Sequence, residues 1–119
     1  MNAEELKQRT KRFGLEVIKL VESLPKTRTT EVIGRQLLRS GTSVGANYRA
    51  TCRGRSKADF ISKAGIVIEE ADESIYWMEL LLEAKLASEI QTTDLIKEAD
   101  EIVAILTASV KTDRKNLQS

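Results

Sequence analysis

"GANYRATCRGRSKADF", residues 45–60, lies between two long helical patterns and contains the signals that end one helix and begin the next. Gly54 is the residue type that most often follows a helix C-terminus. Ser56, with an acid at Asp59 three residues later, is a variant of the capping box that opens a helix. A break this short brings the flanking helices together as antiparallel neighbours. The stretch therefore predicts a helical hairpin at the centre of the chain.

The hairpin extends outward in both directions. Before Pro25, the only proline, Phe13, Val17, Leu20 and Leu24 recur at helical spacing. After the second helix of the hairpin, a further apolar stripe follows a threonine pair that can cap a helix. The stripe consists of Leu95, Ala99, Ile102, Val103, Leu106 and Val110. No stretch alternates with period two, so strands are not expected.

The predicted architecture is all-α, an antiparallel up-down four-helix bundle in a single domain covering residues 1–119. The expected helices span about residues 4–24, 30–53, 57–87 and 93–112, with Thr29 or Thr30 capping the second and Thr92 or Thr93 capping the fourth. The polar tail "KTDRKNLQS" is expected to fray. At 119 residues the chain can bury a sizeable core without disulfides.

The chain contains no histidine and a single cysteine, Cys52. This composition excludes Ser-His and Cys-His nucleophile systems, His-ligated zinc and the Glu-x-x-His di-iron pattern. Glu70 and Glu73 could face one ligand, but carboxylate sites in bundles also need histidines or a matching pair from another helix. We therefore predict no enzyme activity, no metal site and no cofactor.

A lone cysteine suits a reducing compartment, and the N-terminal residues MNAEELKQRT lack the apolar core of a signal peptide. No apolar run approaches the roughly 20 residues of a membrane span. The expected location is the cytoplasm, with no membrane partner.

The net charge of +1 hides a marked asymmetry. Residues 1–63 contain 14 Lys and Arg against 6 Asp and Glu, a balance of +8, whereas residues 64–119 contain 5 against 12, a balance of −7. Such a division indicates two complementary surfaces, or one basic surface that has a partner.

The basic residues concentrate on the second predicted helix. At about 100° per residue, Arg35, Arg39, Arg49 and Arg53 occupy one arc of about 80°, on the side away from the core. Arg55 and Lys57 cluster at its end, where the turn itself requires only glycine and serine. These six residues are the candidate contacts to RNA or DNA, through phosphates rather than base edges.

A second interpretation of the stripe stays open. The arginines could form ion pairs with Glu70, Glu73 or other acids of the third predicted helix, or with acids of a neighbouring subunit. The protein would then be a structural scaffold, or an adaptor for a protein partner. Gly41 and Gly45, one turn apart, indicate a close approach between helix backbones or a kink. Ser43 and Asn47, near Gly45, are a candidate buried polar pair.

The third predicted helix carries more apolar surface than one core stripe needs. Beyond the expected core face of Phe60, Ala64, Val67, Ala71, Ile75, Met78 and Leu82, a second face contains Ile66, Glu70, Glu73, Trp77 and Leu80. A helix that is apolar on two faces indicates a second packing partner, most simply another copy of the chain. The Trp77 N–H would need an acceptor, for which Glu73 is the nearest candidate.

Two stretches, "RQLLRSGTSVGANYRATCRGRSKADF" (residues 35–60) and "IVIEEADESIYWMELL" (residues 66–81), resemble the family of 23S rRNA intervening-sequence proteins. That family includes the accessory protein of diversity-generating retroelements. The resemblance covers about residues 13–110. It rests on Gln36, Leu37, Arg39 and Ser40, on Ser43, Val44 and Asn47, on Arg55 and Ser56, and on Asp59, Phe60 and Ile61.

The resemblance implies a homo-oligomer, a pentameric barrel of bundles. In the retroelement relatives it implies a basic surface that binds nucleic acid and a nucleic-acid-handling protein, a reverse transcriptase. Many members follow the asparagine with Ile-Ala-Glu-Gly, whereas this chain has Tyr48-Arg49-Ala50-Thr51. A role carried by that glutamate therefore does not transfer. For the intervening-sequence members the resemblance implies no established biochemical activity, so fold transfers better than function.

Overall fold

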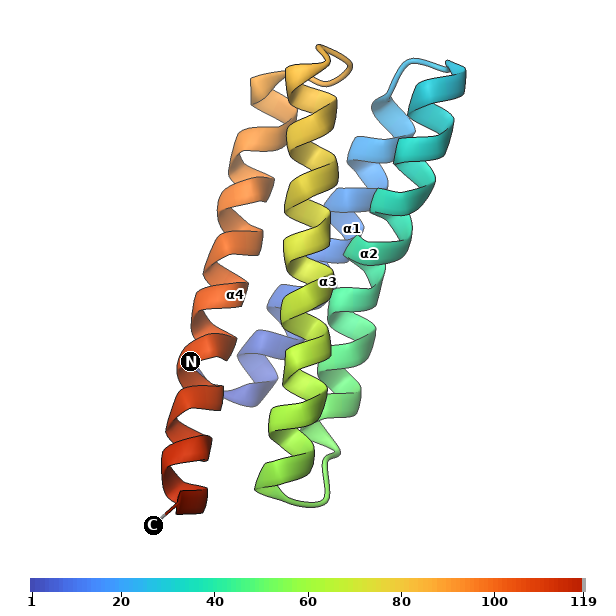
Figure 1. Cartoon of the computed structure of the whole chain (residues 1–119). Helices are drawn as coiled ribbons and strands as arrows, with labels where there is room; N and C mark the ends of the chain where they lie inside the picture. The colour runs from blue at the N-terminus through green and yellow to red at the C-terminus, as the bar shows by residue number, and fades with distance from the viewer. Residues whose placement is uncertain (119) are drawn as a thin grey trace.

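The computed structural model describes residues 1–118, which form four helices and no strand. The all-α, four-helix prediction is confirmed. Successive helices alternate in direction, up and down along one long axis (Figure 1). In chain order they are α1 (Ala3–Ser23), α2 (Arg28–Cys52), α3 (Lys57–Glu83) and α4 (Glu89–Gln118).

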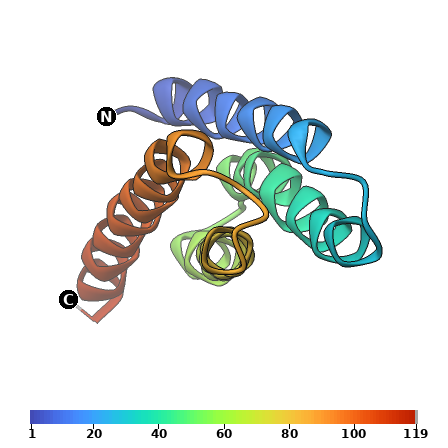
Figure 2. The same cartoon turned by 90° about the horizontal axis from the view of Figure 1, so that it is seen from above.

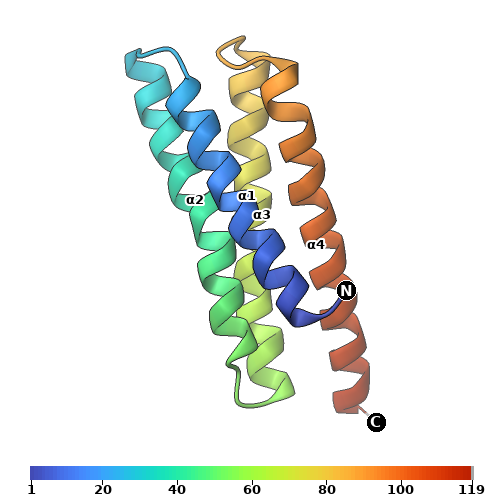
Figure 3. The same ribbon diagram turned by 180° about the vertical axis from the view of Figure 1, so that it is seen from behind.

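The helices occupy the four corners of a rod of 52 × 21 × 20 Å. Viewed from above, α1 lies diagonally opposite α3, and α2 diagonally opposite α4 (Figure 2). The α1–α2, α2–α3 and α3–α4 pairs pack extensively, whereas α1 touches α4 over a shorter stretch. From behind, α1 crosses obliquely and is shorter than its neighbours, so the N-terminus lies partway along α4 (Figure 3).

One face of every helix fills the core. The largest fully buried side chains are Phe13 from α1, Leu37 from α2, Met78 and Leu81 from α3, and Ile102 and Leu106 from α4. Each contributes roughly 1.5–3 kcal/mol relative to an exposed position.

The core face of α3 is rotated from the predicted one, because Ser74 and Leu81 are buried where Ile75 and Leu82 were expected and these two are only half-buried. Ser74 can lie in the core because its hydroxyl pairs with that of Ser40 across the α2–α3 contact, at 2.8 Å.

The N-terminus of α2 differs from the prediction. Thr27, not Thr29 or Thr30, is the N-cap, and its hydroxyl accepts from the Thr30 backbone N–H at 3.1 Å. The Thr30 hydroxyl accepts in return from the Thr27 backbone N–H at 3.0 Å. The third helical position of a capping box is usually Glu or Gln, and here it is Thr30. The Ser/Thr-x-x-Glu/Gln pattern therefore does not predict Thr27 as the N-cap.

The α3–α4 turn also differs. α3 ends at Glu83, earlier than the expected residue 87, and the chain turns through Lys85 in the left-handed region at φ 61°. α4 then begins at Glu89, not at residue 93. Ser88 and Gln91 form a reciprocal cap, with hydrogen bonds of 3.2 and 2.9 Å between side chains and backbone N–H groups. Thr92, expected as a cap, is fully buried instead.

The polar tail is helical as far as Gln118 rather than frayed from residue 112. Val110 is buried and secures the helix against the core near this end. Lys115 in the last turn is placed favourably with respect to the helix dipole.

Candidate nucleic-acid interface

The six cations predicted to contact nucleic acid fall into three environments. Arg35 and Arg39 lie in the first half of α2, Arg49 and Arg53 in its second half, and Arg55 and Lys57 at the α2–α3 turn. All six are exposed. They do not form one uniform stripe, because the neighbouring helices differ along α2.

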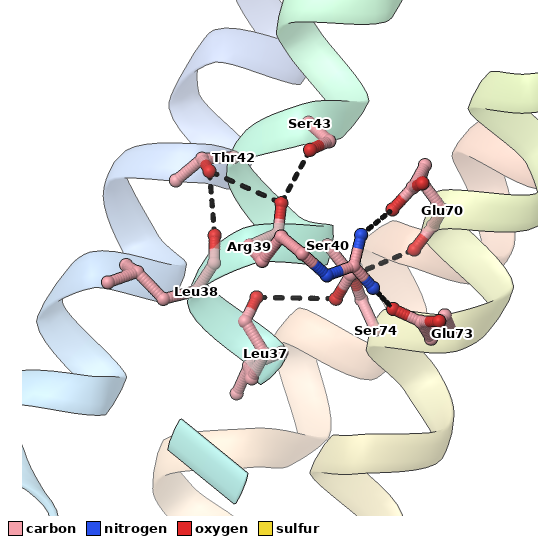
Figure 4. Close-up of polar contacts among 9 residues, drawn as sticks. All are labelled: Leu37, Leu38, Arg39, Ser40, Thr42, Ser43, Glu70, Glu73 and Ser74. Carbon is pink, nitrogen blue, oxygen red and sulfur yellow. Dashed lines mark hydrogen bonds and ion pairs between the residues drawn. The ribbon is translucent and has the colours of Figure 1, made fainter. Parts of the chain in front are cut away.

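Arg39 is held within the chain by carboxylates of α3 (Figure 4). Its guanidinium donates to Glu70 at 3.2 Å and also to Glu73. The Arg39 side chain remains 48% exposed, so each pair contributes no more than about 1 kcal/mol. Arg35 makes a weaker contact with Glu31, one turn before it, at 3.9 Å. The predicted ion pairs with the third helix are therefore present for Arg39 but not for Arg35, whose contact lies on its own helix.

Arg49 and Arg53 line a groove between α1 and α2, together with Lys7 and Lys11 of α1. The open volume of this groove is about 520 Å³. In each helix the two cations are four residues apart and therefore share a face. We call these four residues the basic groove.

Carboxylates are scarce in the basic groove. Glu4, the one acid that lines it, lies 3.9 Å from Lys7 and is largely exposed. Within residues 1–118, no carboxylate forms an ion pair with Lys11, Arg49 or Arg53. Four like charges on two adjacent helices raise the local positive potential and attract anions.

Glycines bring the two rows of cations together. A Cβ on Gly45 would lie 3.2 Å from the Thr10 carbonyl oxygen, and a Cβ on Gly41 only 2.7 Å from both Val17 methyl carbons. The predicted close approach of helix backbones is therefore present, and it occurs between α1 and α2. The backbone contact at Gly45 places Lys7 and Lys11 next to Arg49 and Arg53.

The predicted polar pair of Ser43 and Asn47 is absent from the core of the described chain. Both residues are only half-buried, and the Ser43 hydroxyl donates to the Arg39 carbonyl of its own helix at 2.6 Å (Figure 4). Ser40 and Ser74 supply the buried hydroxyl pair instead.

The α2–α3 turn is organised by Asp59 rather than by its cations. Ser56 caps α3 as predicted, accepting from the Asp59 backbone N–H at 3.1 Å. The Asp59 carboxylate accepts from the Arg55 backbone N–H at 3.0 Å and pairs with Lys63 at 3.2 Å. These contacts, the first above all, hold the pKa of Asp59 below its usual value. The turn therefore presents Arg55 and Lys57 from a fixed backbone at the end of α2.

The residues predicted for a subunit interface lie together on α3. Ile66 is 46% exposed, Trp77 and Leu80 are half-buried, and Glu70 and Glu73 are engaged by Arg39. The predicted bond from Trp77 to Glu73 is not formed. The indole nitrogen is shielded from solvent and finds no acceptor among the described residues, while the ring packs edge-on against Tyr76.

Lys7 and Lys11, the α1 half of the basic groove, were not predicted from the sequence. They lie about 40 residues before Arg49, so only the packing of α1 on α2 brings them together. The available signal was a lysine pair at i and i+4 on a helix adjacent to one with Gly41 and Gly45. Arg9, which joins α1 to α4 through Glu98 and Glu101, each at 2.6 Å, was also not predicted.

Two further properties bear on the kind of site. Across residues 1–118, no group of three or more Cys, Asp or Glu residues is arranged to hold a metal ion. In the same part of the chain, no helix is both long enough and apolar enough to cross a membrane.

The fold defines an all-α protein of the four-helix class with a basic groove on one side. Residues 3–108 match the model of the family described as 23S rRNA-intervening sequence protein, and the chain belongs to this family. A crystal structure of a protein of unknown function from the S23 ribosomal protein family, from Bacteroides thetaiotaomicron, is similar, with a TM-score of 0.85 and 33% identity. The similarity covers 93% of this chain and 99% of that one. A search of curated proteins found no significant match.

Proposed function

We propose that this protein binds nucleic acid, RNA in the first instance, through the phosphates that its basic groove attracts, and that it performs no catalysis. One observation carries the proposal: Arg49 and Arg53 line one groove with Lys7 and Lys11, and the two arginines have no carboxylate partner within residues 1–118. Arginine forks match phosphate geometry, and a cluster of cations releases counterions when it neutralises phosphates. Arg55 and Lys57 extend the same basic surface beyond α2.

A binding experiment tests this proposal. Fluorescence anisotropy with a labelled structured RNA, across a salt series, is measured for the natural chain and for Arg49→Glu/Arg53→Glu. Four phosphate contacts predict a loss of about 10² in affinity between 50 and 200 mM salt. The variant should lose most of the binding at low salt.

A charge-matched control separates the groove from net charge. Arg12→Glu/Lys19→Glu makes the same change in charge on the α1–α4 side of the molecule, where both residues line a different groove. Binding should change little. Equal losses in the two variants, or no binding by the folded natural chain at low salt, would contradict the proposal.

The second candidate function is a scaffold or adaptor for a protein partner, which is considered because the Arg39 contacts within the chain leave fewer arginines of α2 for phosphates. Arg39 serves the packing of α2 on α3 instead of facing solvent freely. In this role the protein assembles with a nucleic-acid-handling protein in the cytoplasm. Pull-down of such a partner by a chain that binds no RNA would favour this role over the first.

We further propose that copies of the chain assemble through α3, in the pentamer that the family resemblance implies. The exposed Ile66 on α3 supports this, because another copy could cover its apolar side chain. Light scattering on chains of 13.3 kDa gives the number of copies. Ile66→Glu should reduce that number, whereas Ile90→Glu, an exposed control on α4, should leave it unchanged.

A further inference from the structure

The basic groove contains no aromatic side chain. The chain has five aromatic residues: Phe13 and Tyr48 are buried in the core, Phe60 is half-buried at the start of α3, and Tyr76 and Trp77 lie on α3. None of them lines the groove between α1 and α2. The groove therefore lacks the flat apolar platforms on which unpaired bases stack.

The remaining lining is aliphatic or small. Leu15 and Ile18 continue the α1 side of the groove and are exposed, and Gly14, Gly45 and Ala46 also line it. Aliphatic side chains give unpaired bases no stacking surface comparable to an aromatic ring. Four of the eight polar residues that line the groove are cations, which bind phosphate oxygens without reading sequence; the other four are Glu4, Gln8, Thr10 and Thr42.

The spacing of the two helix backbones that carry the cations is also fixed. α1 and α2 touch backbone to backbone beside Gly45, so the Lys7–Lys11 row cannot move freely relative to the Arg49–Arg53 row. Along each helix the two charges are separated by about 6 Å of axial rise. Two rows at a fixed separation suit a ligand whose phosphates are themselves held in a regular array.

We infer that the ligand of the basic groove is a double-stranded nucleic acid, bound by its phosphate backbone with its bases stacked internally. This inference rests on the proposed nucleic-acid binding and adds the class of ligand. In a duplex the bases stack on one another, so the protein needs to supply only charge and shape. The guanidinium groups of Arg49 and Arg53 then act as forks on phosphates rather than as stacking planes.

The test compares strands with duplexes. Labelled RNA of about 20 nucleotides, without self-complementarity, is titrated alone and after annealing to its complement, with the DNA duplex of the same sequence as a third arm. We expect the RNA duplex to bind at least about 10-fold more tightly than the single strand at equal salt. Arg49→Glu/Arg53→Glu should abolish that preference, and Arg12→Glu/Lys19→Glu should retain it.

The outcomes separate the two proposals. Single strands that bind as tightly as duplexes, with the loss in Arg49→Glu/Arg53→Glu preserved, would overturn the duplex inference and leave nucleic-acid binding intact. Failure of every nucleic acid to bind the folded natural chain would overturn both. The DNA arm identifies the source of the phosphates: equal affinities support recognition of duplex charge in general, and tighter RNA binding supports recognition of the A-form shape.

Discussion

Arg39 and Arg49 lie on the same helix and differ in what faces them. Arg39 faces α3, whose Glu70 and Glu73 both accept from its guanidinium. Arg49 faces α1, whose charged residues in the groove are Lys7, Lys11 and the largely exposed Glu4. One arginine therefore contributes to the packing of its own chain, while the other raises a positive potential that the chain leaves largely uncompensated.

The charge asymmetry of the sequence has the same origin. The acidic second half of the chain forms α3 and α4, and these helices supply the partners of Arg39 and Arg9. The α1–α2 face lies away from the α3–α4 contact and receives few of those acids. Position relative to α3 and α4, rather than residue type, therefore decides which cations are free to bind a ligand.

The largest predicted effect concerns the crossing that assembles the basic groove. Gly41→Ala places a Cβ 2.7 Å from two methyl carbons of Val17, a stiff β-branched residue. Overpacking outweighs the gain in helix propensity, and we expect a loss of about 1–2 kcal/mol in the free energy of unfolding. Urea denaturation followed by circular dichroism measures it.

Gly65→Ala is the matched control for this change. Gly65 is also inside a helix, but nothing lies within 4 Å of an added Cβ. The substitution should raise stability by up to about 1 kcal/mol. If both alanines stabilise the protein, the α1–α2 crossing is looser than described, and the fixed geometry of the groove is no longer supported.

The second prediction concerns Arg9, which resembles Arg39 in having two carboxylate partners but is less exposed, at 20%. Arg9→Met removes a two-pronged contact to Glu98, at 2.6 and 2.7 Å, and leaves Glu98 and Glu101 close together. We expect a loss of about 1–2 kcal/mol, because hydrogen bonds between charged groups are the stronger ones. Arg12 forms no ion pair within residues 1–118 and provides the control. The free energy of unfolding of Arg12→Met should lie within about 0.5 kcal/mol of that of the natural chain.

The helices themselves could be predicted from sequence because each signal is local. Apolar spacing and the Ser56 cap gave the number and order of the helices. Errors arose at ends that use unusual residues, such as Thr30 in a capping box and Lys85 in a left-handed turn. Residue propensity predicts neither a threonine at the third position of a capping box nor a lysine in the left-handed region, where glycine is the usual residue.

Only the α2 half of the basic groove was predicted from the sequence, because the α1 half depends on contacts between helices. An angular calculation on α2 places Arg39 and Arg49 about 80° apart. It does not show that this angle separates the side of α2 that meets α3 from the side that meets α1. Lys7 and Lys11 enter the groove only through that packing. Gly41 and Gly45 indicated a close approach but not which helix approaches.

The third prediction tests the comparison directly, with one neutral substitution in each environment. Arg39→Gln should lower the free energy of unfolding by no more than about 1 kcal/mol and leave the salt dependence of nucleic-acid binding unchanged. Arg49→Gln should leave stability unchanged and reduce the slope of log affinity against log salt by about 1. Chemical denaturation and anisotropy on the same preparations give both values. Equal salt dependence of binding in the two variants would show that the different neighbours of Arg39 and Arg49 do not affect nucleic-acid binding.

The smallest predicted effect concerns the turn at the end of α2, where Asp59 is stabilised as an anion by the Arg55 backbone N–H and by Lys63. Its pKa in the folded chain is lowered, so the ionised carboxylate stabilises the fold above the ordinary carboxyl pKa of about 3.9. That contribution is lost as the pH falls through the lower folded value.

Asp59→Asn should therefore have a slightly lower melting temperature than the natural chain at pH 7. The difference between the two melting temperatures should shrink below about pH 4. Thermal melts from pH 7 down to pH 2 follow this difference. A gap that stays constant into acid would mean that the contacts of Asp59 do not depend on its charge, and that the backbone presenting Arg55 and Lys57 is fixed by the Ser56 cap alone.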